Sequence, residues 1–123
     1  MTSVGVLDNR PPEHPIWHAP GTDFKDVRWT WKQFGSIVDL TGDTATLTIH
    51  AEETSVALVT LTSGAGKLTL VTGASSNITA NADAADFSAI TARGKYFWKL
   101  VLSGTHNEVL AFGDWFEGLD SID

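Results

Sequence analysis

Apolar and polar residues alternate along most of this chain with a period of two, which is the pattern of half-buried antiparallel strands. The clearest case is segment 44–51, where Ala45, Leu47 and Ile49 share one side and threonines share the other with His50. Threonine, valine and isoleucine also favour strands because their side chains are branched at Cβ. The pattern therefore predicts an all-β protein.

Similar segments recur at about 8–12-residue spacing, separated by turns rich in glycine, serine, asparagine and aspartate. The predicted strands are Phe24–Lys32, Ile37–Leu40, Thr44–Ala51, Val56–Leu61, Lys67–Thr72, Asn77–Ala82, Lys95–Ser103 and Glu108–Phe116. We expect an antiparallel, Ig-like β-sandwich of about seven or eight strands. The strand over 95–103 has apolar residues on both sides, which predicts a central strand or one covered by a partner.

One segment, between Asp83 and Ile90, breaks the alternation. Asp83 is a good helix N-cap, alanines follow it, and Phe87 and Ile90 are spaced to share one helix face. We expect a short helical crossover of about one or two turns in this segment.

The first 23 residues contain all four prolines, at positions 11, 12, 15 and 20. Proline ends helices and removes a ladder donor, so we predict an extended N-terminal arm over 1–23. Its apolar residues leave two interpretations open, a disordered tail or an arm that lies on a neighbouring subunit. We expect a β-sandwich domain over 24–118 that is complete without the arm. An acidic tail over 119–123 follows it.

Composition excludes several functions. The chain has 123 residues, which fits one domain, and no cysteine, which excludes disulfides and thiolate chemistry. Its net charge of -7 opposes contact with phosphate backbones, so no nucleic-acid partner is expected. No apolar run approaches the ~20 residues of a membrane span, and no signal peptide is visible, so no membrane partner is expected.

The histidines and carboxylates predict neither metal binding nor catalysis. His14 and His18 are separated by Pro15, which prevents a shared helix face, while His50 and His106 are expected at the surface. The aspartates that flank the turn at Gly42 are interpreted as turn caps. No nucleophile–base pair or phosphate loop is present. We therefore expect no catalytic residue, no metal and no cofactor.

Five tryptophans are the chain's unusual aromatic feature. Trp29, Trp98 and Trp115 are predicted to pack in the core, although Trp31 or Trp98 could instead form a flat platform for a sugar. Residues with more apolar surface than their segments need are the candidates for a subunit interface. These are Ile16, Trp17, His18, Trp31 and Phe97.

Three motifs, in order, resemble the N-terminal Ig-like domain of phage and prophage baseplate upper proteins and their short stand-alone relatives. The first is Val38-Asp39-Leu40-Thr41-Gly42-Asp43-Thr44-Ala45, the second the hairpin over 58–70, and the third Gly94-Lys95-Tyr96-Phe97-Trp98-Lys99-Leu100 followed by Val109-Leu110-Ala111-Phe112-Gly113. The chain departs from that pattern in its proline-rich arm and at Trp98, where a charged residue is more usual.

The resemblance implies a non-enzymatic structural subunit of a phage virion, in the tail, baseplate or fibre attachment. Its partners would be other virion proteins and copies of itself, and it would be made in the bacterial host cytoplasm. Two alternatives stay open. A capsid decoration protein would use the arm to hold its neighbours, and a carbohydrate-binding module of a tail would use exposed tryptophans.

Overall fold

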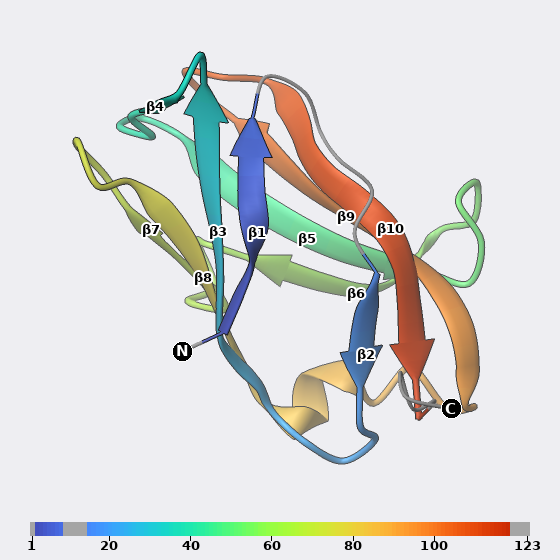
Figure 1. Cartoon of the computed structure of the whole chain (residues 1–123). Coiled ribbons are helices and arrows are strands. Elements are labelled where there is room, and N and C mark those ends of the chain that lie inside the picture. Colours follow the sequence, from blue (N-terminus) through green and yellow to red (C-terminus); the bar gives the residue numbers. More distant parts are fainter. Residues whose placement is uncertain (1, 9–14, 119–123) are drawn as a thin grey trace.

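A computed structural model describes residues 2–8 and 15–118 of the protein (Figure 1). Within these residues the fold is nearly all-β, with two five-stranded sheets and one short 3-10 helix, η1 (Ala84–Phe87). The period-two alternation thus gave the correct fold class. The acidic tail over 119–123 and His14 lie outside the described residues.

The two sheets draw their strands from both halves of the chain. The first sheet has the order β1 (Thr2–Asp8), β3 (Phe24–Gln33), β8 (Asn77–Ala82), β7 (Leu68–Val71), with β4 (Ser36–Ile37) paired to β3. The second has the order β2 (Ile16–His18), β10 (Glu108–Glu117), β9 (Gly94–Ser103), β5 (Thr44–His50), β6 (Ala57–Thr62). β9 lies at the centre of the second sheet, as its two apolar sides predicted.

The segment predicted as a free arm contributes one edge strand to each sheet. β1 pairs parallel with β3, and β2 pairs parallel with β10, whereas the other pairings are antiparallel. Pro15 and Pro20 flank β2 rather than interrupt it, and an edge strand tolerates nearby prolines because one of its sides needs no partner. The described part of the arm is extended, as expected, but it pairs with its own domain.

The core lies between the two sheets and is dominated by aromatic rings. Trp29 of β3 and Trp98 of β9 meet across the sheets with ring centroids 6.0 Å apart, and both are buried with Trp115. Besides these tryptophans, the apolar positions Leu47, Ile49, Leu68 and Leu100 of the alternating pattern are fully buried. Val27, Leu70 and Tyr96 are partly buried against the same core.

The crossover from β8 to β9 contains η1, in the segment that the alanine-rich pattern indicated. The carboxylate of Asp86 accepts a hydrogen bond of 2.8 Å from the N–H of Asp83, and the carboxylate of Asp23 accepts one of 2.8 Å from Ala84. Phe87 then enters the core. These contacts satisfy the first N–H groups of the turn, so a four-residue helix is stable here.

The turn that precedes β5 is held by two aspartates, as the sequence suggested. Asp39 accepts hydrogen bonds of 2.9 Å from the N–H groups of Thr41 and Gly73, and one of 2.7 Å from the hydroxyl of Thr41. The Thr41 hydroxyl, followed by the two N–H groups, holds the pKa of Asp39 below its ordinary value. Both carboxylates therefore have structural partners, since Asp43 contacts His106 at 2.6 Å.

Candidate functional site

The outer side of the second sheet carries an unusual number of aromatic side chains. Along β9 and β10, alternate residues enter the core and the residues between them face outward, because successive side chains of a strand point to opposite sides. On the last part of β10, Gly113, Trp115 and Glu117 are buried, while Phe112 and Phe116 are only partly buried. This outer face, formed by the outward residues of β2, β10, β9, β5 and β6, is the candidate binding surface.

The register of β9 and β10 places charged and aromatic residues side by side on the outer face. Lys95 lies opposite Phe116, Phe97 opposite Asp114, and Lys99 opposite Phe112. Directly opposite residues in an antiparallel pair are close enough for their side chains to touch. The face is therefore a mixed surface of rings and charges, with threonines of β5 and β6 continuing it.

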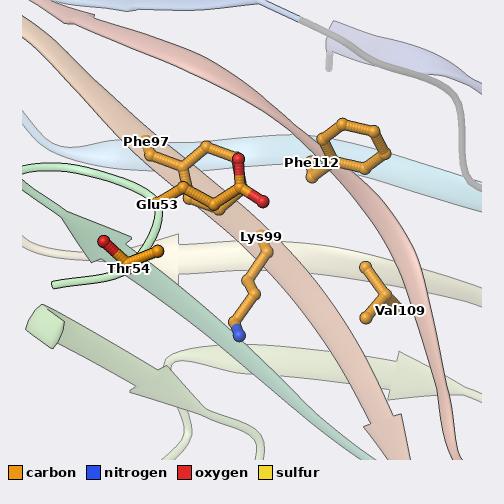
Figure 2. A pocket seen from close by; sticks show the side chains of 6 residues that line it. All are labelled: Glu53, Thr54, Phe97, Lys99, Val109 and Phe112. Atoms are coloured by element: carbon orange, nitrogen blue, oxygen red, sulfur yellow. The ribbon is translucent and has the colours of Figure 1, made fainter. Parts of the chain in front are cut away.

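A pocket of about 420 Å³ opens in the middle of the outer face. Figure 2 shows Phe97 and Lys99 on β9, with Phe112 and Val109 on one side and Glu53 and Thr54 of the β5–β6 loop on the other. The rings of Phe97 and Phe112 have centroids 6.3 Å apart and form an aromatic wall. The pocket thus combines apolar walls with one ammonium group and one carboxylate.

His50 holds in place the β5–β6 loop, whose residues Glu53 and Thr54 line the pocket. Its Nδ1 lies 2.8 Å from the carbonyl oxygen of Ser55, which only accepts, so Nδ1 carries a proton. Its Nε2 lies 2.8 Å from the hydroxyl of Thr48. The side chain is buried by these contacts, which corrects the expectation that His50 is a surface residue. The loop is thereby held beside Phe97.

Of the candidate interface residues, Trp17 and Phe97 are the two that reach the outer face. Trp17 is 44% exposed and stacks on Phe116, with ring centroids 5.1 Å apart and an interplanar angle of 21°. Phe97 lines the pocket. An aromatic pair at one edge and an aromatic pocket in the middle therefore mark the same face.

Ile16 and His18 lie in the core of their own domain instead. Ile16 is 6% exposed and His18 is 5% exposed, because β2 alternates and places both on the inner side of the sheet. Nδ1 of His18 lies 2.8 Å from the carboxylate of Glu117, which also accepts a 2.9 Å hydrogen bond from the indole of Trp115. Nε2 of His18 lies 3.0 Å from the carbonyl oxygen of Thr22.

This buried network joins the start of the chain to the end of β10. Phe24, Phe87 and Trp115 surround the imidazole of His18 with ring centroids 6.2, 4.6 and 5.3 Å away. No pattern in the sequence indicates this network, because Glu117 and His18 are 99 residues apart and both are ordinarily surface residues. Because the network is buried, it can hold β2 against the rest of the sheet, but it cannot contact a substrate.

Trp31 and Trp98 cannot form the sugar platform considered from the sequence, because they are 4% and 0% exposed. Trp31 packs edge-on against His106, with ring centroids 5.1 Å apart. His106, expected at the surface, is partly buried and bonded to Asp43 through both its N–H and its ring. Among the described residues, Phe34 in the turn between β3 and β4 is 92% exposed, and the rings on the outer face are the exposed Trp17 and the partly buried Phe97, Phe112 and Phe116.

Within residues 2–8 and 15–118, no group of three or more histidines, cysteines or carboxylates is arranged to hold a metal ion. In the same ranges, no helix is both long and apolar enough to cross a membrane.

The main cluster of ion pairs lies away from the outer face, where Lys25 and Lys67 bind Asp83 at 3.0 and 3.4 Å. Hydrogen bonding to Lys25 holds the pKa of Asp83 below its ordinary value.

No protein-family model matches the chain, and no curated protein matches it either.

Proposed function

We propose that the protein is a non-enzymatic structural subunit of a phage virion, in the tail, baseplate or fibre attachment, with an Ig-like sandwich as its fold. The observation that carries the proposal of an assembly role is the outer face, where Trp17, Phe97, Phe112 and Phe116 expose aromatic surface between charged residues. Aromatic residues at the centre of a contact are those that contribute most to protein–protein binding. Assignment to a virion rests on the ordered motifs of the sequence.

The partners in this proposal are other virion proteins and copies of the same chain. Symmetric assemblies are built from repeated identical contacts, and a single rigid face on a β-sheet suits such a contact. The protein would be made in the bacterial host cytoplasm and end in the particle. It would need neither cofactor nor metal in that role.

The test is to locate the protein in particles released from the strain that carries the gene. Immunogold electron microscopy is expected to label the tail or baseplate, whereas label on the capsid would favour a decoration protein. A Phe97→Asp variant should fold but fail to enter particles, and a Val71→Asp variant, on the exposed side of the other sheet, should enter normally. Absence of the wild-type chain from purified particles would contradict the proposal.

A second candidate function is carbohydrate binding, and the pocket in Figure 2 is the observation that favours it. The rings of Phe97 and Phe112 offer apolar surface for the C–H side of a sugar, while Lys99 donates hydrogen bonds and Glu53 accepts them. Saturation-transfer NMR with host surface glycans tests it. Transfer to a glycan that is lost in Phe112→Ser and kept in Val71→Asp would support this function.

A further inference from the structure

The charged side chains on the outer face lack partners within the described part of the chain. Lys25 and Lys67 are joined to aspartates by ion pairs of 3.0 to 3.8 Å, but none of the ion pairs within residues 15–118 includes Lys95, Lys99 or Asp114. Lys99 and Asp114 are nevertheless partly buried between aromatic neighbours. Partly desolvated charges gain more from a partner than fully exposed charges do.

The charge of this face is balanced, although the chain as a whole is strongly acidic. Lys95 and Lys99 are matched there by Asp114 and by Glu53 in the pocket wall, whereas the net charge of the chain is -7. Two copies would repel each other through most of their surfaces. This face is a place where two copies can approach with charges of both signs available for pairing.

The face has the size of a weak, concentration-dependent contact. Its five strands β2, β10, β9, β5 and β6 together have 36 residues, which cover about 570 Å² at ~3.3 Å per residue and ~4.8 Å per strand. A standard interface buries ~800 Å² on each partner, and transient contacts bury less.

We propose that the outer face of this sheet binds the same face of a second copy about a two-fold axis. Such a contact is self-complementary, so lysines of one copy meet carboxylates of the other while the aromatic rings pack at the centre. The stacked Trp17–Phe116 pair and the Phe97–Phe112 wall supply the apolar surface. The inference deepens the proposed assembly role and rests on it, because it names the partner of that face.

The experiment measures self-association of the full chain by sedimentation velocity from about 1 µM to about 1 mM. The wild type is expected to form dimers as its concentration rises. Lys99→Glu should raise the dissociation constant about tenfold or more, because it makes the face acidic in both copies. Lys32→Glu, on β3 of the other sheet, changes the net charge equally and should leave the constant within about twofold.

Hydroxyl-radical footprinting across the same concentrations locates the contact. Trp17, Phe97 and Phe112 are expected to become protected as dimers form, while Val71 on the other sheet stays reactive. A wild type that stays monomeric throughout, or a Lys32→Glu effect equal to that of Lys99→Glu, would overturn the inference. Protection of the same rings by an added glycan, in a monomeric protein, would also overturn it and assign the face to a sugar.

The two proposals fail separately in these experiments. A chain that is monomeric in solution but labels the tail of purified particles would keep the virion role and reject the two-fold contact. A chain that dimerises through this face but is absent from particles would keep the contact and reject the virion role.

Discussion

In the second sheet, the same strands place buried aromatic rings on the inner side and partly exposed aromatic rings on the outer side. On β9, Trp98 is fully buried while its neighbour Phe97 lines an open pocket; on β10, Trp115 is fully buried while Phe116 stacks under an exposed Trp17. Burial of the inner rings stabilises the fold, because apolar surface leaves water on folding. The outer rings keep part of that surface exposed, so it remains available to stabilise a complex.

The largest expected difference between the two sides comes from β2. Deleting residues 1–18 removes β1 from the first sheet and β2, with the buried Ile16 and His18, from the second, and it leaves the buried Glu117 without its imidazole partner. The free energy of unfolding should fall by more than about 5 kcal/mol, from the lost core packing and the unpaired buried charge together. Urea denaturation measures it.

The matched control for this deletion is Trp17→Ala, which removes the one side chain of β2 that faces outward. It should lower the free energy of unfolding by less than about 1 kcal/mol. A truncated chain as stable as the wild type would show that the body does not need β2, as the strand pattern after Phe24 alone suggested.

Substitutions of two neighbouring aromatic residues of β9 test the difference in burial between the inner and outer sides. Trp98→Ala should cost about 3–5 kcal/mol, because it opens a cavity opposite Trp29. Phe97→Ala should cost less than about 1 kcal/mol, because part of the ring already lies in water. Equal costs in thermal or chemical denaturation would contradict the assignment of the two sides.

The contrast between the two sides was visible in the sequence where both strands of a pair alternate regularly. The eight strands from Phe24 onward, the short crossover and most of the core follow from period-two alternation and turn residues. β2 could not be found this way, since three residues between prolines show no period. Neither could the Glu117–His18 contact, which depends on the parallel pairing of β2 with β10.

The candidate site was only partly predictable for the same reason. Trp17 and Phe97 stood out because their segments carry apolar residues beyond the needs of one buried side. Trp31 looked similar but is covered by His106, which comes from a distant turn. The pocket also needs Glu53 and Thr54, whose position depends on the bonds of His50 to Ser55 and Thr48. Such loop placement has no periodic signal in the sequence.

Two carboxylates of β10 test the same difference between the sides, with a smaller expected change in the free energy of unfolding. Glu117→Gln removes the charge that binds His18 and should lower the free energy of unfolding by about 2 kcal/mol, since buried hydrogen bonds to charged groups contribute roughly that amount. Asp114→Asn, on the outer side of the same strand, should change it by less than about 0.5 kcal/mol. Guanidinium denaturation of the two variants measures the difference, and a larger effect at Asp114 would reverse the two roles.

The smallest expected effect is the contribution of the ion pair between Asp83 and Lys25 to the pH dependence of stability. Hydrogen bonding and charge attraction from Lys25 hold the pKa of Asp83 below its ordinary value of 3.8. A carboxylate whose pKa is lower in the folded state adds stability above its unfolded pKa, and this stability is lost as pH falls through the folded pKa. Stability should therefore decrease below about pH 4, and Asp83→Asn should flatten that decrease while asparagine still caps η1. Urea midpoints measured between about pH 5 and pH 2.5 test this, and a decrease in Asp83→Asn as steep as in the wild type would show that the ion pairs of Asp83 add no stability.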